Sequence, residues 1–330
     1  MATKIGFCIP TYNRSALLNQ CLERIFSEVG YDIEVVIVDG GSTDETSLVI
    51  KSYIDNGYDI KYFKRDLRCG VDLDIIKCIE LSSADFCWLF SDDDLLEVDA
   101  FDAINRIVSV NPSAAGFSLD YQAYDLHLNY KVKTVPANVN ARPTKIPLVM
   151  TIDEAFINLG QHLGFISSQI VNRKLWLEVM KKYDYVRFCN SWIIIYMIGK
   201  MLQLNNCWVF IPLKAVRCRT GNDSFLADHG IYGRQIIAHV NYLEVIAELF
   251  PIKGATYTFV CINMIKVRMA RSLAVIKSYN PAYLLQYRIL KIYIKFYYKF
   301  SIFWFKIVPI FFIPNIFFIY LKKYYFKSLK

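Results

Sequence analysis

Short apolar runs alternate with amphipathic segments over the first 125 residues, and this alternation restricts the chain to few folds. The apolar runs cover residues 5–9, 33–38, 60–63, 86–90 and 115–119. Segments with helix-like spacing separate them, over 15–27, 43–53, 72–81 and 97–108. Strands that alternate with helices favour right-handed crossovers and a sheet covered on both faces. The sequence therefore predicts an α/β fold with a Rossmann-like, mostly parallel sheet.

The pattern becomes less regular after about residue 125. We expect strands over 165–172 and 208–216, helices over 175–182 and 191–202, and mainly helices from there to the end. At 330 residues the chain has room for one large domain and an appendage. We expect a first domain over 1–230 and a helical C-terminal region over 231–330.

Polar clusters follow three of the predicted strands, beginning at Pro10, Asp39 and Asp92. Ligands of parallel sheets bind beyond the carboxyl ends of the strands, so we expect the three clusters to meet at one edge. The spacing of Ser42 and Glu45 matches a capping box and predicts that a helix begins there.

Three consecutive carboxylates, Asp92, Asp93 and Asp94, follow the apolar run that ends at Phe90. A helix N-terminus favours one or two such side chains, and this ordinary helix start is one interpretation. A third carboxylate in the same turn adds repulsion that a bound cation would offset. Oxygen ligands suit Mg²⁺ or Mn²⁺ better than zinc, and such an ion completes its coordination with substrate phosphates. The alternative interpretation is therefore a divalent metal bound together with a diphosphate.

The formal net charge of +8 is unevenly distributed. The last acidic residue is Glu248, and residues 249–330 contain 14 Lys and Arg, which leaves 24 basic and 30 acidic side chains before them. Aromatic residues and Lys alternate over 281–330, where the uncharged run 307–321 is interrupted by Pro309 and Pro314. A membrane span needs about 20 apolar residues. We expect an interfacial or re-entrant membrane segment and no nucleic-acid binding; a helical cap packed on the protein is the alternative.

The beginning of the chain and its cysteines bear on its compartment. The first residues lead directly into a strand pattern, and the nine cysteines form no C-x-x-C pair. We expect no secretory signal peptide, reduced thiols and no zinc site.

Three motifs resemble those of family 2 glycosyltransferases with the A-type fold: IPTYNR over 9–14, VDGGSTD over 38–44 and SDDD over 91–94. The resemblance covers about residues 3–230 and implies a nucleotide-sugar donor and a divalent metal, Mn²⁺ or Mg²⁺. FSDDD over 90–94, SWI over 191–193 and RTGND over 219–223 are similar to motifs of the abequosyltransferases of bacterial O-antigen assembly. That similarity implies transfer of a 3,6-dideoxyhexose such as abequose from a CDP-sugar to a lipid-linked oligosaccharide, at the cytoplasmic face of the inner membrane.

The resemblance also implies roles for individual residues. The nucleotide-sugar-binding set is Pro10, Thr11, Asn13, Arg14, Asp39, Gly41, Arg68, Asp92 and Asp93. Asp92 and Asp94 are the implied metal ligands. Arg219 and His229 are candidates for stabilising the negative charge on the leaving diphosphate, and Arg234 is a third. A solvated surface charge is the alternative for Arg68 and for each of these three residues.

The catalytic base is less well defined. Inverting relatives carry an acidic pair, often Glu-Asp, at the start of a helix, whereas this chain has KYDY over 182–185 and then NSW over 190–192. Asp184 is the nearest carboxylate and is the candidate base. A solvated loop residue is the alternative for Asp184, and a retaining mechanism, which needs no base at that position, is left open. A membrane-anchored nucleotide-sugar-binding protein without catalysis is the alternative function. A nucleotidyltransferase would need a Gly- and Lys-rich N-terminal signature, which the sequence lacks.

Overall fold

The computed structural model describes residues 4–133, 146–222 and 224–327. The chain divides into two compact units, Met1–Asn222 and Asp223–Lys330.

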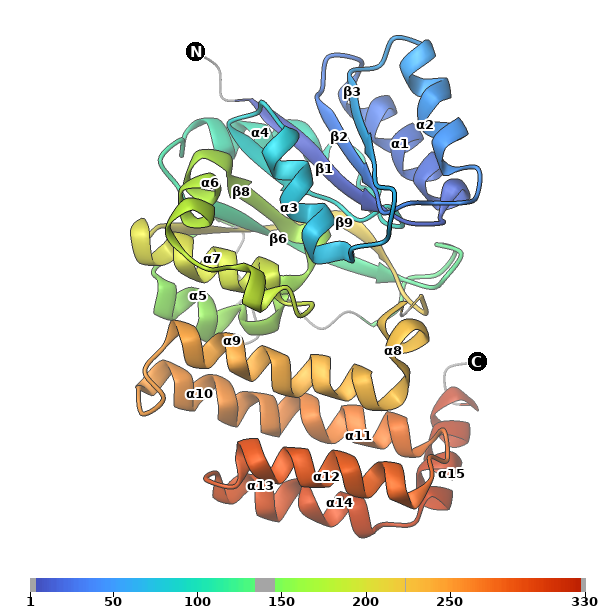
Figure 1. The fold of residues 1–330 in the computed structure, drawn as a ribbon, viewed down its shortest axis with the longest axis vertical. Coiled ribbons are helices and arrows are strands. Elements are labelled where there is room, and N and C mark those ends of the chain that lie inside the picture. Colours follow the sequence, from blue (N-terminus) through green and yellow to red (C-terminus); the bar gives the residue numbers. More distant parts are fainter. Residues whose placement is uncertain (1–3, 134–145, 223, 328–330) are drawn as a thin grey trace. The chain divides into compact units, whose positions relative to one another are not determined.

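One sheet of nine strands forms the centre of the first unit, within the residues described above (Figure 1). The strands are β1 (Ile5–Thr11), β2 (Val35–Asp39), β3 (Ile60–Lys64), β4 (Phe86–Leu89), β5 (Leu95–Leu96), β6 (Gly116–Tyr124), β7 (Leu148–Met150), β8 (Gln169–Asn172) and β9 (Trp208–Arg219). Their order is β3-β2-β1-β4-β8-β6-β9-β5, with β7 paired to β9. Strands β1, β2, β3 and β4 are mutually parallel, and β6 and β9 run the same way, whereas β8, β5 and β7 are antiparallel to their neighbours. The predicted α/β fold with a largely parallel sheet is confirmed.

Helices cover both faces of this sheet. They are α1 (Ser15–Val29), α2 (Thr46–Asp55), α3 (Val71–Leu81), α4 (Ala100–Ser109), α5 (Ile152–Asn158), α6 (Arg173–Lys182) and α7 (Ile193–Leu204). On one face, Phe7 of β1 belongs to a core cluster with side chains of α1 and α4. Helix α3 is not part of that cluster and packs on β1 and β2 from the other face. The residues of β1, β2 and β4 are all buried, as expected for parallel strands covered on both faces.

The structure corrects three local predictions. The capping box at Ser42 does not form: α2 begins at Thr46, and the Asp44 carboxylate accepts hydrogen bonds from the Thr46 amide and hydroxyl. Ser42 Oγ instead accepts a hydrogen bond from the Asn13 amide, because the loop folds back on the end of β1. Strand β1 continues through Pro10 to Thr11, and β8 begins only at Gln169, after a 3₁₀ turn over Ile166–Ser168.

The second unit is helical throughout the part that the structure describes. Its helices are α8 (Ser224–Gln235), α9 (Tyr242–Leu249), α10 (Ala255–Asn263), α11 (Ala270–Lys277), α12 (Tyr283–Tyr297), α13 (Ser301–Lys306), α14 (Val308–Phe312) and α15 (Asn315–Lys327). Two π-helical segments, Ile236–Asn241 and Met264–Met269, join α8 to α9 and α10 to α11. Tyr293 and Tyr297 of α12 are buried, and their hydroxyls donate to Gln235 Oε1 and to the His239 carbonyl.

Among the described helices, none is both long enough and apolar enough to cross a membrane by itself. Ser301–Phe312 and Asn315–Lys323 together reach that length and composition, with a bend of 89° between them. The bend falls where Pro314 follows α14, since proline disfavours a helical conformation in the residue before it.

Candidate active site

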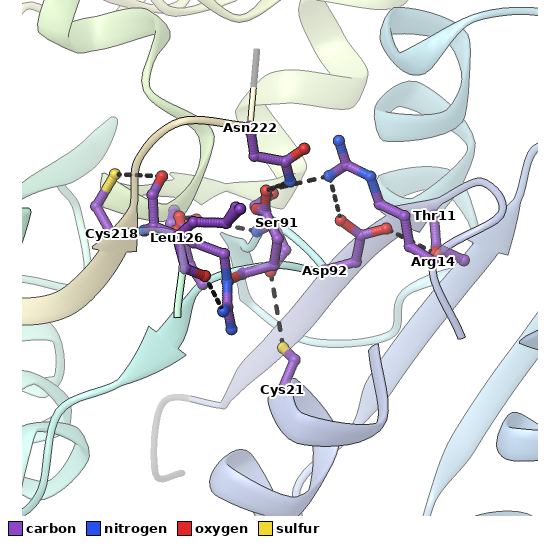
Figure 2. Close-up of polar contacts among 12 residues, drawn as sticks. Thr11, Arg14, Cys21, Ser91, Asp92, Leu126, Cys218 and Asn222 are labelled. Carbon is purple, nitrogen blue, oxygen red and sulfur yellow. Dashed lines mark hydrogen bonds and ion pairs between the residues drawn. The ribbon is translucent and has the colours of Figure 1, made fainter. Parts of the chain in front are cut away.

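Carboxylates gather at the carboxyl edge of the sheet, in the short segment between β4 and β5 (Figure 2). Asp92, Asp93 and Asp94 are all buried, with 3%, 8% and 2% of their surface exposed. Thr11 and Arg14, at the end of β1 and the start of α1, lie against them. We call these five residues the carboxyl-edge cluster.

Asp92 connects the first and third predicted motifs directly. Its Oδ2 accepts a hydrogen bond from Thr11 Oγ1 at 2.7 Å, and its Oδ1 accepts one from Arg14 Nη1 at 2.9 Å. Arg14 Nη1 also lies 3.2 Å from Asp93 Oδ2, so one guanidinium faces two carboxylates. The predicted convergence of these motifs is therefore observed as contacts between side chains.

Asp94 points toward a different part of the sheet. Its Oδ2 accepts a hydrogen bond from Ser167 Oγ at 2.6 Å, and its Oδ1 accepts one from the Arg219 amide at 2.9 Å. Asp93 lies between its neighbours and accepts a hydrogen bond from Asn222 Nδ2 at 2.8 Å. Strand β9 and the 3₁₀ turn before β8 thus complete the surroundings of the carboxyl-edge cluster.

The electrostatics of the cluster follow from burial and crowding. Burial raises the pKa of Asp92 to about 6, although the charge of Arg14 opposes the shift. Burial, followed by the repulsion of Asp93, raises the pKa of Asp94 well above its ordinary value. Burial alone would lower the pKa of Arg14, but Asp92 and Asp93 outweigh it and raise that pKa. A cation at this edge would relieve the crowding of negative charge.

Arg219 lies inside the site, buried to 9% exposure. Its Nε donates to the Asp93 carbonyl at 2.9 Å, Nη1 to the Leu126 carbonyl at 2.6 Å and Nη2 to Gln20 Oε1 at 3.0 Å. The guanidinium therefore joins β9, α1 and the turn after β6 to the backbone of the cluster. It places a buried positive charge against the backbone of Asp93.

The second predicted motif forms a tight turn next to this edge. Asp39 is fully buried; its Oδ1 accepts from the amides of Gly41 and Ser42, and its Oδ2 accepts from Tyr62 Oη at 2.9 Å. Gly41 has φ +93°, and a Cβ there would lie 3.2 Å from the Arg65 carbonyl oxygen, so this turn requires glycine. The carboxylate of Asp39 thereby shapes the turn after β2.

The remaining predicted nucleotide-site residues lie around the same turn. Asn13 has φ +52°, and its Oδ1 accepts from the Thr43 amide at 2.8 Å. Arg68 is exposed and stacks its guanidinium 4.4 Å from the ring centre of Tyr12. Pro10, within β1, pairs with Val38 of β2, which brings the first two motifs side by side.

The predicted catalytic residues are not all gathered there. Asp184 is exposed in the turn after α6, where its carbonyl oxygen lies 3.5 Å from Tyr196 Oη. His229 and Arg234 belong to α8 of the second unit, where Phe225 stacks on the His229 ring and lies below the Arg234 guanidinium. Of the residues proposed for catalysis, Arg219 is the one that contacts the carboxyl-edge cluster within the described contacts.

Three contributors to the site are not among the predicted residues: Ser167, Asn222 and Gln20. Ser167 lies within the predicted strand 165–172, whereas in the structure it belongs to the 3₁₀ turn. Asn222 stands in the RTGND motif, which did signal a functional loop. Gln20 lies 199 residues from its partner Arg219, and no local pattern indicates such a contact.

The donor atoms of the cluster suit a hard divalent cation, because they are carboxylate oxygens. Within residues 4–133, 146–222 and 224–327, no group of three or more His, Cys, Asp or Glu side chains is arranged to hold a metal ion. All oxygens of Asp92 and Asp94 already accept hydrogen bonds, which leaves one further lone pair on each. The residues fit an ion that takes most of its ligands from a bound diphosphate.

Comparison with known proteins agrees with this geometry. Residues 7–165 match the glycosyl transferase family 2 model. The chain is 26% identical over 265 residues to the abequosyltransferase RfbV of Salmonella typhimurium, a match that covers 74% of this chain and 75% of that protein.

Solved structures show that the fold is shared. The S. aureus protein TarS (residues 1–349) in complex with UDP-GlcNAc superposes with a TM-score of 0.55 at 13% identity, covering 86% of this chain and 83% of TarS. A mannosyltransferase of Pyrobaculum calidifontis, in complex with GDP-Man and Mn²⁺, gives a TM-score of 0.54 at 14% identity, covering 83% and 75%. The chain therefore carries a glycosyl transferase family 2 domain, which confirms the family predicted from its three motifs.

Proposed function

We propose that the protein transfers a sugar from a nucleotide-sugar donor to a lipid-linked oligosaccharide in O-antigen or lipopolysaccharide biosynthesis. The observation that carries this proposal is the pairing of Thr11 and Arg14 with Asp92, which joins two family motifs in one buried cluster. Similarity to an abequosyltransferase supports abequose or another 3,6-dideoxyhexose, supplied as a CDP-sugar.

The nucleotide part of the donor would bind along the carboxyl ends of β1 and β2. The Arg68–Tyr12 pair offers an exposed planar surface on which a base can stack. The Gly41 turn lets a ligand approach the backbone, and Asp39 and Asn13 hold that turn in place. Pro10 and Thr11 would line the pocket from β1, while Asp92 and Asp93 would contact the ribose.

A divalent ion, Mn²⁺ or Mg²⁺, would be held by Asp94 and Asp92 together with the donor diphosphate. When bound, the ion would offset negative charge on the leaving group. The described protein residues supply too few ligands to hold an ion alone, so binding of metal and donor should depend on each other. The mannosyltransferase with GDP-Man and Mn²⁺ shares the fold, which supports this use of the edge.

Fixed positive charge is available for the leaving diphosphate. Arg14 has 22% of its side chain exposed, and the buried Arg219 donates one of its side-chain hydrogen bonds to the Asp93 carbonyl of the cluster. His229 of α8 is the third proposed contributor, and Asp184 is the base proposed from sequence. Cations placed beforehand at a developing negative charge stabilise the transition state without reorganisation.

The second unit offers a surface suited to a membrane interface. One face of α12, together with the two residues that follow it, carries exposed apolar, aromatic and basic side chains: Leu284, Tyr287, Arg288, Lys291, Lys295, Tyr298 and Lys299. Its opposite face is buried through Ile289, Tyr293 and Tyr297. Aromatic rings favour the boundary of a bilayer, and each Lys or Arg near an anionic surface contributes about 1 kcal/mol.

We therefore propose that residues 1–230 bind donor and acceptor, and that residues 231–330 attach the enzyme to the cytoplasmic face of the bacterial inner membrane. The bent pair of helices around Pro314 is compatible with a re-entrant segment. Attachment would bring the site to a lipid-linked acceptor.

The donor is tested by thermal unfolding in the presence of CDP-, UDP-, GDP- and dTDP-sugars with Mn²⁺. The correct donor should raise the midpoint most, because a ligand that binds only the folded state stabilises it by mass action. Sugar transfer should then stop in EDTA and return with excess Mn²⁺ or Mg²⁺. Full transfer in EDTA would refute the metal, and donor binding without any transfer would indicate a binding protein.

The membrane surface is tested on the full chain by vesicle co-sedimentation. Replacing Lys291, Lys295 and Lys299 with Gln should weaken binding to anionic vesicles by on the order of 100-fold, from about 1 kcal/mol per charge. Deleting 281–330 is less informative, because it also removes the buried Tyr293 and Tyr297. Unchanged binding by the triple variant would contradict the role of α12.

A further inference from the structure

A buried carboxylate lies at the start of α3, outside the motifs that identify the family. Asp72 is 8% exposed, and its Oδ2 accepts a hydrogen bond from the Ser191 amide at 2.7 Å. No described Arg, Lys or His forms an ion pair with it. Burial raises the pKa of Asp72 to about 7, although the Ser191 amide opposes the shift.

An Asp in the first turn of a helix usually caps that helix. Asp72 occupies the first turn of α3, but the N-cap position is Gly70, and no side chain caps the helix. The observed partner is the backbone of a residue 119 positions later in the chain. The carboxylate therefore links α3 to the segment before α7 and is not explained as a cap.

Ser191 is held in an unusual conformation at this contact. Its φ is +77°, which a residue with a side chain seldom adopts, and it immediately precedes Trp192 and the first turn of α7. Strained backbone of this kind collects at functional sites when the surrounding structure enforces it. Here the Asp72 carboxylate fixes the strained amide.

The contact also belongs to the edge that carries the donor site. Helix α3 starts just after β3, so its first turn lies at the carboxyl edge. On one side, a Cβ on Gly40 would lie 3.0 Å from Asp74 Oδ2, which places α3 beside the Asp39 turn. On the other side, Trp192 packs on Gly164, in the segment whose Ser167 binds Asp94. The first turn of α3 therefore adjoins the second motif, and the segment bonded to Asp72 packs near the turn whose Ser167 contacts Asp94.

We infer that Asp72 is the general base of the transfer reaction, an inference that rests on the function proposed above. Ser191 lies just before α7, and α3 brings a carboxylate to its amide from another part of the chain. Asp72 takes the proton of the acceptor hydroxyl, and the oxygen electron pair forms the new bond to the anomeric carbon. The bond to the diphosphate breaks, and its electron pair remains on the phosphate oxygen. The configuration of the anomeric carbon is inverted.

The test compares the full-length wild type with Asp72→Asn, which keeps an oxygen for the Ser191 amide and removes the charge. We expect kcat to fall by about 10²- to 10⁴-fold, the usual contribution of a general base. The donor KM should change less than about threefold, and the melting temperature should not fall. Glu80→Gln, an exposed carboxylate on the same helix, is the control and should keep wild-type kcat.

Several outcomes would overturn the inference. They are an Asp72→Asn variant with near-wild-type kcat, a comparable loss found in Asp184→Asn instead, or a wild-type product that retains the anomeric configuration by NMR. The NMR result decides even if the variant does not fold. Failure of the proposed function would look different: the wild type itself would neither bind a nucleoside diphosphate nor transfer sugar.

Discussion

Acidic side chains at opposite edges of the same sheet differ in how their charge is satisfied. At the amino edge, Glu34 precedes β2 and accepts hydrogen bonds from Lys61, Ser82 and Ser83. Burial alone would raise the pKa of Glu34, but these bonds outweigh it and lower the pKa to about 2. At the carboxyl edge the pKa of Asp92 and of Asp94 is raised.

The difference distinguishes a structural carboxylate from a functional one. The surroundings of Glu34 stabilise the charged form, so the charge contributes to folding. The carboxyl-edge cluster holds three carboxylates that Arg14 does not fully compensate, and the raised pKa of Asp92 and of Asp94 means that their charged forms oppose folding. Perturbation in this direction, in a buried cluster, is typical of functional sites.

The largest effect should come from removing charge at the carboxyl edge. Asp94→Asn and Asp92→Asn should each lower kcat by on the order of 10²- to 10³-fold, the loss seen when one preorganised electrostatic partner is removed. Asn can still accept the hydrogen bonds from Ser167 and Thr11. Initial rates of sugar transfer measure the effect, with Asp55→Asn at the exposed end of α2 as control. Wild-type turnover in both variants would show that the carboxylates of Asp92 and Asp94 are not needed for sugar transfer.

At the amino edge the expected effect is on stability and not on catalysis. Glu34→Gln should lower the free energy of unfolding by on the order of 2 kcal/mol, because charged hydrogen bonds to Lys61, Ser82 and Ser83 are lost. Urea denaturation measures this change, while kcat should equal that of the wild type. A catalytic defect in the folded variant would show that the two edges are not functionally separate.

The pH dependence of stability should have opposite signs at the two edges. Glu34 has a lowered pKa, so its contribution is present above its ordinary pKa of 4.5 and is lost as the pH falls toward about 2. Asp72 has a raised pKa, so its contribution is present below 3.8 and is lost as the pH rises through about 7. The loss of stability in Glu34→Gln should therefore become smaller in acid. The free energy of unfolding of Asp72→Asn should rise relative to that of the wild type as the pH rises to 8. Denaturation at several pH values distinguishes these trends, and parallel curves would contradict the shifts.

The smallest effect should come from the neutral partner of the cluster. Asn222→Ala removes one hydrogen bond to Asp93 and should lower kcat by a factor of about 2 to 10, from about 0.5–1.5 kcal/mol. Asn56→Ala at the end of α2 is the matched control. A loss as large as that of Asp94→Asn would mean that Asn222 has a direct role in donor binding.

Much of the first unit could be predicted from sequence because its signals are local. The apolar runs predicted β1 to β4, and the polar residues at the ends of these runs predicted that the motifs meet at one edge of the sheet. The contacts of Thr11 and Arg14 with Asp92 agree with that prediction. Local rules also failed where a distant residue competed for a side chain. Ser42 and Glu45 do not cap α2, since Asn13 uses the Ser42 hydroxyl, whereas Thr151 and Glu154 form the same pattern as a true capping box.

The contacts around Asp94 were beyond sequence reasoning. Ser167 and Arg219 are 73 and 125 residues away in the chain, and only the strand order β4-β8-β6-β9 brings them together. The contact of Asp72 with Ser191 was also not predictable, because an Asp in the first turn of a helix is an ordinary pattern. Long-range pairings decide which carboxylates are buried, and burial decides their chemistry.

The hydrogen bond from Asn222 to Asp93 has a mechanical consequence. Asn222 is the last residue of the first unit, so the chain leaves that unit while anchored to an acidic side chain of the site. A ligand that competes for Asp93 Oδ2 would release this anchor. Occupancy of the site would then change the hydrogen bonding of the residue at which the first unit ends.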